Sequence, residues 1–257
     1  MPSTDESPGQ RRATGRSVHT VDDVLALLDQ LFEERADRWS DRGGTDFWDA
    51  FYTDRGRGVP FFRDAPDESL VAWHADGRLP LGPGTRVLEL GCGPGRNAVW
   101  LAQQGCAVDA LDLSATALAW GRERADAAGV AVRFVRADVL GWRGEAPYDV
   151  VVDSGCFHHL PPHRRVSYRW LLERVLRPGG HLALTCFTTG HAGDGGTEAD
   201  DLDLYRTGSL GGGLAYGPDD LRRAFDWLTE VELRPMRRVR DATTYGEDLL
   251  QVALLRR

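Results

Sequence analysis

Residues 86–105 read RVLELGCGPGRNAVWLAQQG. The first five residues predict a buried strand, and residues 96–105 predict a helix that ends at Gly105. Between the two lie Gly91, Gly93 and Gly95. Because glycines have no side chains, a ligand could lie directly against the backbone N–H groups at the start of the helix. The stretch therefore predicts a strand, a ligand-binding loop and a helix.

The alternation of strand and helix continues downstream. Strands are predicted at 107–113, 132–139, 148–155 and 181–187, and helices at 114–129, with Ser114 as N-cap and Gly129 at its end, and at 161–180. Strands that alternate with such helices indicate a doubly wound, mostly parallel α/β sheet. A helix at 218–226 precedes two late strands, 228–235 and 248–257. Because no long helix separates these strands, they predict an antiparallel C-terminal hairpin at the sheet edge.

The N-terminal third has a different composition. Residues 1–18 are rich in Ser, Pro, Gly and Arg and predict a disordered tail. Residues 19–80 predict a helical, aromatic-rich segment that could cover the ligand as a lid, and residues 81–257 the main ligand-binding domain. Within the lid segment, residues 21–39 predict a helix with Thr20 as N-cap. Two apolar stripes at helical spacing are expected to be buried, one in this helix and one in 161–180: Val21, Val24, Leu25, Leu28, Leu31 and Phe32, and Val166, Trp170, Leu171 and Val175.

Charge and composition exclude several classes of protein. The net charge of −8 disfavours non-specific nucleic-acid binding. No apolar stretch approaches the length of a membrane-spanning helix, and the first 20 residues lack the apolar core of a signal peptide. The four cysteines form no C-x-x-C pair, which favours a reducing, cytoplasmic location. We therefore expect a small-molecule partner, with neither nucleic acid nor membrane bound. The sequence leaves the oligomeric state open.

Two acidic residues follow the glycine loop at the ends of successive strands. Asp112 ends the second predicted strand, where a carboxylate can accept hydrogen bonds from both ribose hydroxyls of an adenosine. Asp138 ends the third, where a carboxylate can meet an adenine amino group. A dinucleotide loop requires a third glycine at the position that Arg96 occupies here. The pattern favours an adenosine cofactor that carries an amino acid rather than a second nucleotide.

Four segments together resemble a known family. LELGCGPGRNAVWLAQQG, DALDLS, RADV and YDVVVDSGCFHHL, spanning 85–190, resemble the motifs of class I S-adenosylmethionine (SAM)-dependent methyltransferases. More narrowly, they resemble small-molecule methyltransferases of the thiopurine and tellurite-resistance type. The resemblance implies a Rossmann-like, seven-stranded sheet with an antiparallel last strand, and SAM as cofactor. It implies a cofactor-binding set made of Glu89, Gly91, Cys92, Gly93, Gly95, Asn97, Asp112, Leu113, Asp138, Val139 and Asp153.

Within that set the resemblance assigns different parts of SAM. The three glycines would line its methionine part, and Glu89 would orient the loop or the ammonium group. Asp112 would hold the ribose and Asp138 the adenine amino group, with Leu113 and Val139 against the adenine. Asp153 would face the sulfonium end.

Candidates for chemistry cluster after the fourth predicted strand. His158 and His159 lie where the methyl group should emerge, and either could be a general base, although both could instead have a structural role. Cys156 together with His158, His159 and His163 could be read as metal ligands, but no fourth ligand at regular spacing is evident, so no metal is expected. Cys156 as a covalent nucleophile is a further, weaker alternative.

Aromatic residues are the candidates for substrate contact. They are Trp48, Tyr52, Phe61, Phe157, Tyr205 and Tyr216, of which Tyr205 belongs to a long acidic loop at 190–213. The hypothesis is in-line displacement of the SAM methyl group by a small-molecule nucleophile (S, O or N), which gives S-adenosylhomocysteine; a soft nucleophile is slightly favoured, and a role in secondary metabolism is compatible. The alternatives are a non-catalytic SAM-binding sensor or scaffold protein and an NAD(P)-dependent oxidoreductase.

Overall fold

The computed structural model describes residues 18–33, 44–144, 147–191, 195–240 and 242–257. The predicted tail, except for Val18, and the end of the predicted helix 21–39 lie outside these residues. Within them, the helices are α1 (Val21–Glu33), α2 (Gly44–Thr53), α3 (Glu68–Ala75), α4 (Arg96–Gln103), α5 (Ala115–Ala128), α6 (Arg164–Val175), α7 (Asp201–Thr207) and α8 (Pro218–Ala224). Among the described helices, none is long and apolar enough to cross a membrane.

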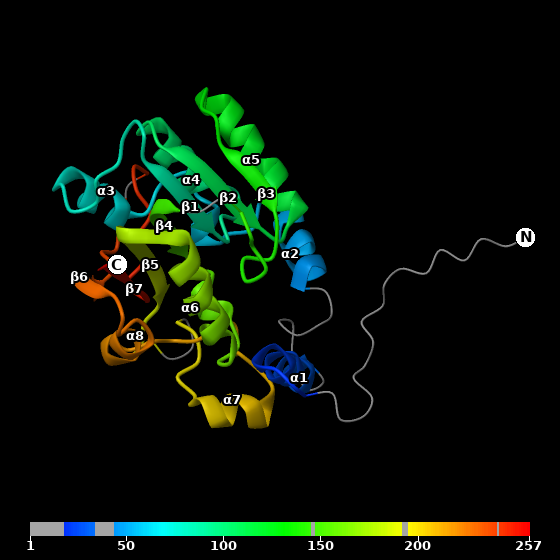
Figure 1. The fold of residues 1–257 in the computed structure, drawn as a ribbon. Helices are drawn as coiled ribbons and strands as arrows, with labels where there is room; N and C mark the ends of the chain where they lie inside the picture. Colours follow the sequence, from blue (N-terminus) through cyan, green and yellow to red (C-terminus); the bar gives the residue numbers. More distant parts are fainter. Residues whose placement is uncertain (1–17, 34–43, 145–146, 192–194, 241) are drawn as a thin grey trace, which may run out of the picture.

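A twisted sheet forms the centre of the molecule (Figure 1). In the described residues it has seven strands in the order β3-β2-β1-β4-β5-β7-β6. β1 to β5 are parallel, whereas β7 lies antiparallel between β5 and β6, so the predicted doubly wound sheet with its C-terminal hairpin is confirmed. The bounds are β1 (Arg86–Leu90), β2 (Ala107–Asp112), β3 (Arg133–Arg136), β4 (Tyr148–Ser154), β5 (Leu176–Phe187), β6 (Thr229–Pro235) and β7 (Leu250–Arg256).

Helices cover both faces of this sheet. Side chains alternate between the faces of a strand, and in β4 Val150 and Val152 join one buried cluster while Val151 joins the other. The first cluster contains side chains of α3, α4 and α5, and the second contains side chains of α6, α7 and α8. This two-sided burial explains why the middle of β4 is a continuous apolar run, Val150 to Val152.

The predicted helix boundaries follow from identifiable caps. The Ser114 hydroxyl accepts a hydrogen bond from the Ala117 amide at the start of α5, and Gly129 ends that helix in the left-handed conformation. At the start of α1, the Thr20 hydroxyl accepts a hydrogen bond from the Asp23 amide. Both predicted N-caps are confirmed. Each satisfies an N–H group that has no partner within its own helix.

Both predicted apolar stripes are too wide. In α1, Leu25 and Phe32 are buried, but Val21, Val24 and Leu31 are exposed. In α6, the stripe rotates toward Tyr168 and Leu172, and Val166 and Trp170 are exposed. Helical spacing identifies an apolar face, but the neighbouring elements decide how much of that face is covered. Two further differences are α7, which lies within the predicted loop 190–213, and β5, which begins at Leu176 rather than at residue 181.

Candidate active site

A cavity of about 1120 Å³ lies at the carboxyl ends of the parallel strands. Its wall includes the loops that follow β1, β2, β3 and β4, the end of β5, and side chains of α2 and α6. β1 lies between β2 and β4, where the connections turn to opposite sides of the sheet. Ligands of open α/β sheets bind at such a switch point. The position agrees with the loop that the sequence singled out.

The glycine loop brings bare backbone to the cavity wall. Gly91 and Gly93 have φ angles of +62° and +52°, which favour glycine. A Cβ atom at Gly91 would lie 2.8 Å from Cβ of Cys156, and one at Gly93 would lie 2.9 Å from the Tyr52 hydroxyl oxygen. Larger residues would therefore fill the space between this loop and its neighbours. Gly91, Cys92 and Gly93 all line the cavity.

Asp112 is tied to the glycine loop by its own carboxylate. One oxygen accepts a hydrogen bond from the Gly93 amide at 2.7 Å, and the other accepts one from the Ser114 amide at 2.8 Å. Burial raises the pKa of this carboxyl to about 6. A carboxylate has about four lone-pair sites, so Asp112 can still accept hydrogen bonds from a ribose. The residues fit an adenosine ligand.

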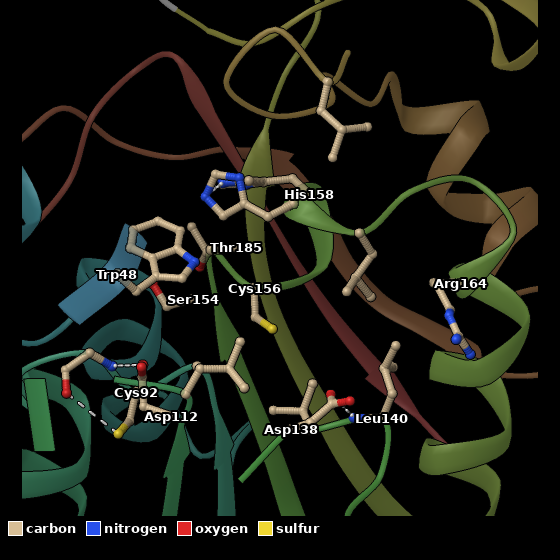
Figure 2. A pocket seen from close by; sticks show the side chains of 18 of the residues that line it. Trp48, Cys92, Asp112, Asp138, Leu140, Ser154, Cys156, His158, Arg164 and Thr185 are labelled. Atoms are coloured by element: carbon tan, nitrogen blue, oxygen red, sulfur yellow. Dashed lines mark hydrogen bonds between the residues drawn. The ribbon is translucent and has the colours of Figure 1, made fainter. Parts of the chain in front are cut away.

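The rest of the predicted adenosine pocket lies along the same wall. Leu113, Asp138 and Val139 line the cavity. One Asp138 oxygen accepts a hydrogen bond from the Leu140 amide at 2.9 Å, which turns the chain after β3. Figure 2 shows the side chains of Asp112 and Asp138 along one side of the cavity and the His158 ring along the other. The two carboxylates and the His158 ring therefore lie at different ends of the cavity.

Four predicted cofactor residues are not on the cavity wall. Gly95 lies against the Phe134 ring, and Glu89 is buried in the sheet, where burial raises its pKa to about 8. The Asn97 side chain accepts a hydrogen bond from the Asp67 amide at 2.9 Å. Asp153 accepts hydrogen bonds from the Cys156 and Phe157 amides and the Tyr168 hydroxyl.

The expectation that Asp153 faces the sulfonium end is therefore corrected by this geometry. Its carboxylate is fully buried, and it closes the turn that carries Cys156 instead of facing the cavity. Glu89, Gly95 and Asn97 likewise support the loop from behind. Neighbouring positions at the end of a strand point to opposite faces, so position in the sequence alone did not separate wall residues from supporting ones.

Arg96 is a wall residue that sequence reasoning missed. Its guanidinium forms an ion pair with Asp67 at 2.6 Å and donates a hydrogen bond to the Ser154 hydroxyl at 2.8 Å. It also lies 4.3 Å from the centre of the Tyr245 ring. Arg96 and Asp67 are both buried. The feature of the sequence that could have indicated its role is that an arginine, at the first position of α4, stands where a dinucleotide loop has its third glycine.

Helix α2 covers the glycine loop. Its Tyr52 lies over Gly93, and its Asp49 accepts hydrogen bonds from the Ser114 hydroxyl at 2.7 Å and the Thr116 amide at 3.1 Å. Trp48 stacks on Tyr52, and aromatic contacts continue to Phe61. This arrangement places Trp48, Tyr52 and Phe61, three predicted substrate residues, on the cavity wall.

The other three predicted substrate residues are not on that wall. Phe157 and Tyr216 are buried against each other, with Phe225 after α8 in contact with Phe157. Tyr205 of α7 contacts Phe32 and accepts a hydrogen bond from the His163 amide. These three aromatic residues belong to the packing between α1, α6, α7 and α8. The expectation that they contact substrate is corrected accordingly.

The two histidines lie in a short 3-10 helix, Phe157–His159, and both line the cavity. Their Nε2 atoms are 3.1 Å apart, and Nδ1 of His158 accepts a hydrogen bond from the Phe187 amide at 3.2 Å. Burial lowers the pKa of His158 to about 3. His158 is therefore a neutral ring with both nitrogens engaged, which is unsuited to a general base.

The remaining members of the possible metal set do not converge. His163 turns to Asp29 and Tyr205, with distances of 2.6 Å to each. Across the part of the chain that the structure describes, no group of three or more His, Cys, Asp or Glu side chains could hold a metal ion. The thiol of Cys156 lies at the wall, and burial raises its pKa well above the usual range.

Comparisons with known proteins agree with this geometry. A family model described as a methyltransferase domain matches residues 87–180. Thiocyanate methyltransferase 1 of Arabidopsis thaliana is 29% identical over 74% of this chain and 76% of its own length. Trans-aconitate 2-methyltransferase of Mycobacterium tuberculosis is 34% identical, over 48% of this chain and 42% of its own length. Together these findings support a class I SAM-dependent methyltransferase.

Solved structures support the same fold for this methyltransferase. One similar structure comes from a study titled "Conversion of a Disulfide Bond into a Thioacetal Group during Echinomycin Biosynthesis". It has a TM-score of 0.65 and 28% identity, and the match covers 83% of this chain and 93% of that one. Magnesium protoporphyrin IX methyltransferase of Synechocystis PCC 6803 with bound SAM has a TM-score of 0.58 and 19% identity, covering 83% and 95%. The Rossmann-like fold and the use of SAM are thus confirmed.

Proposed function

We propose that this methyltransferase transfers the methyl group of SAM to a small molecule with a soft nucleophile, sulfur in the first instance. The observation that carries the proposal is the group of large aromatic and apolar side chains on the cavity wall. It includes Trp48, Phe61, Leu160, Phe187 and Leu210. Such a wall favours a polarisable acceptor with little hydration. Two of the similar proteins support sulfur, since one is named for thiocyanate and the other is described by a conversion at disulfide sulfur.

In this proposal the chain's residues act by binding and orienting. The backbone of Gly91 and Gly93 lies against the methionine part of SAM, Asp112 accepts hydrogen bonds from the ribose, and Asp138 meets the adenine amino group. SAM supplies a methyl group on a positively charged sulfur, and the products are S-adenosylhomocysteine and the methylated acceptor. Alignment of acceptor, methyl carbon and sulfur is the main contribution of the protein.

We further propose that residues 19–80 are a cover and residues 81–257 the SAM-binding domain. Support comes from α2, which lies over Gly93 through Tyr52 and is joined to α5 through Asp49. We propose a cytoplasmic location, for which the free thiols of all four cysteines are the support. The acidic net charge supports the proposal that neither nucleic acid nor membrane is a partner.

The experiment combines ligand binding with methyl transfer. Thermal unfolding is measured with S-adenosylhomocysteine, SAM or NAD; at about 100-fold excess over Kd, a ligand adds about 2.7 kcal/mol, which is about 5–10 °C here. SAM with a labelled methyl group is then offered thiocyanate, arylthiols, trans-aconitate, phenols and amines. Transfer to the sulfur acceptors, lost in Asp112→Ala, supports the proposal. Transfer to trans-aconitate alone would show that the acceptor atom is oxygen and not sulfur.

Two other outcomes identify the alternatives. A thermal shift with S-adenosylhomocysteine but no transfer to any acceptor would favour a SAM-binding sensor or scaffold protein. A shift with NAD alone would favour an oxidoreductase, which Arg96 at the third glycine position of a dinucleotide loop already disfavours.

A further inference from the structure

Arg96 has more hydrogen-bond donors than its neighbours use. A guanidinium carries five N–H groups and no acceptor. Its Nη1 group faces the Asp67 carboxylate at 2.6 Å and donates to the Ala65 carbonyl at 3.2 Å, and Nη2 donates to the Ser154 hydroxyl at 2.8 Å. Among the residues that the structure describes, the Nε–H has no acceptor, although Nε keeps accessible surface. Because Arg96 lines the cavity, this donor is available to a ligand.

Two hydroxyl groups next to Arg96 also have unused protons. The Ser154 oxygen accepts from Arg96, which leaves its own O–H without an acceptor in the described part of the chain. The Tyr245 ring centre lies 4.3 Å from the Arg96 guanidinium, and within the described residues the Tyr245 hydroxyl makes no hydrogen bond and is not enclosed. Both side chains line the cavity. These three residues, the donor group, therefore present N–H and O–H groups to a ligand.

The donor group lies between the two ends of the cavity. Ser154 ends β4, the strand next to β1. Figure 2 shows its side chain between that of Asp112 and the His158 ring. A ligand group at this place belongs either to the methionine part of SAM, which lies along the glycine loop, or to the methyl acceptor, which lies toward the histidines.

A wall of donors selects a ligand group that only accepts. A carboxylate offers about four lone-pair sites and no proton, and its hydrogen bonds to an arginine are among the strong ones. Asp67 already sets one negative charge opposite Arg96, so a doubly charged phosphate is disfavoured. A single carboxylate has a positive charge close by in either case. The carboxylate of SAM is joined to an ammonium group, and a carboxylate on the acceptor would lie near the sulfonium.

We propose that Arg96, Ser154 and Tyr245 bind a carboxylate, which is either that of the methionine part of SAM or one carried by the methyl acceptor. The carboxylate accepts from the Arg96 Nε–H and from the two hydroxyls. Asp67 engages Nη1 and thereby holds the guanidinium in place for this contact. The donor group thus fixes one end of a reactant relative to the methyl carbon. The SAM source requires only that SAM binds, whereas the acceptor source rests on the proposed function.

Three variants remove donors one at a time. Ser154→Ala and Tyr245→Phe each remove one hydroxyl. Arg96→Lys retains a positive charge opposite Asp67 but lacks the Nε–H. Tyr216→Phe is the matched control, because Tyr216 is a buried tyrosine off the cavity wall whose oxygen accepts a hydrogen bond from Arg165 at 2.9 Å. Thermal unfolding without ligand shows whether each variant folds, and the two hydroxyl variants decide the test if Arg96→Lys does not.

The first arm measures the carboxylate of the cofactor. Titration calorimetry compares S-adenosylhomocysteine with its decarboxylated form, which keeps the adenosine, the sulfur and the amine. If the donor group binds this carboxylate, each variant should lower the affinity for S-adenosylhomocysteine by roughly 10- to 100-fold, the range for a hydrogen bond to a charged group. The affinity for the decarboxylated form should stay as in wild type, and Tyr216→Phe should change neither.

The second arm measures a carboxylate on the acceptor. Binding of 4-mercaptobenzoate and of thiophenol to the protein saturated with S-adenosylhomocysteine is followed by calorimetry, and methyl transfer from SAM is then measured for both thiols. If the donor group binds the acceptor, the variants should weaken binding of 4-mercaptobenzoate by the same factor and leave thiophenol unchanged. A loss in either arm that is confined to the compound with the carboxylate supports the proposal and identifies the source.

Two outcomes would overturn the proposal. One is that the variants bind all four compounds as Tyr216→Phe does. The other is an equal loss for compounds with and without a carboxylate, since the residues would then act only on the shape of the cavity. Binding without methyl transfer to any thiol contradicts the proposed function instead, and the calorimetry still decides whether a carboxylate is bound.

Discussion

The buried Arg96 guanidinium lies 2.6 Å from the buried Asp67 carboxylate and connects the first turn of α4 to the residue before α3. Asp67 also accepts hydrogen bonds from the side chains of Asn97 and Thr185, so the pair joins α4, β5 and the start of α3. A charge that loses its partner in such a place is costly. This pair holds Arg96, a cavity-wall residue, through a partner that does not itself line the cavity.

We expect Asp67→Ala to lower the free energy of unfolding by about 3–5 kcal/mol, because Arg96 is left buried without its counter-ion. The double variant Asp67→Leu/Arg96→Met should be more stable than Asp67→Ala, since it removes both charges. Urea unfolding measures both. If the double variant were the less stable of the two, the cost would not arise from an unpaired charge.

The affinity for S-adenosylhomocysteine should depend on pH through Asp112. Its pKa is raised to about 6 by burial, and only the deprotonated carboxylate accepts hydrogen bonds at both oxygens. The affinity should therefore be constant above about pH 7 and fall by up to about tenfold per pH unit below about pH 6. Titration calorimetry measures this. Asp112→Asn should bind weakly at every pH without the acid decline; a decline of equal size in that variant would assign it to another group.

The acid stability of the fold should depend on His158. Burial lowers its pKa to about 3, whereas an unfolded histidine titrates near 6.5. Between these pH values the unfolded chain binds a proton at His158 that the folded chain does not. The contribution of His158 to the free energy of unfolding is therefore fully present above about pH 6.5. The contribution is lost by up to about 1.4 kcal/mol per pH unit as the pH falls.

His158→Asn tests this dependence. Urea unfolding at several pH values should show a shallower acid decline for the variant than for wild type. Asp153, with its pKa raised to about 6, has the opposite slope, but it is present in both proteins and cancels in the difference. Parallel declines in the two proteins would mean that His158 accepts a proton in the folded state.

The packing of α2 over the glycine loop should depend on Asp49. Asp49→Ala removes the acceptor for Ser114 and Thr116 at the start of α5, a loss of about 1 kcal/mol, as for a helix N-cap. Hydrogen exchange over 44–53 should accelerate by about fivefold, and S-adenosylhomocysteine should dissociate faster. Asp46→Ala, an exposed acid of the same helix, is the matched control. Equal exchange in the two variants would show that the aromatic contacts alone hold α2.

The strand–loop–helix unit and the caps were predictable because they depend on near neighbours in the chain. Apolar runs, the glycines and Ser114 act within a few residues, so the order of strands and helices and the position of Asp112 follow from the sequence. The sequence also places Gly91, Gly93 and Asp138 at one end of the sheet. This was enough to indicate an adenosine site and the methyltransferase family.

Contacts between distant residues decided the rest. Asp67 forms an ion pair with Arg96, and the Phe187 amide determines the tautomer of His158. Phe157 packs against Tyr216 and Phe225 and therefore does not line the cavity. These residues are far apart in sequence and come into contact only in the folded chain. The same packing left Val166 and Trp170 exposed. Local periodicity determines which faces are apolar, whereas tertiary packing determines which faces are covered and which polar atoms pair. The sequence alone therefore determined the fold and the position of the cofactor loop, and the tertiary structure decided the roles of the side chains around it.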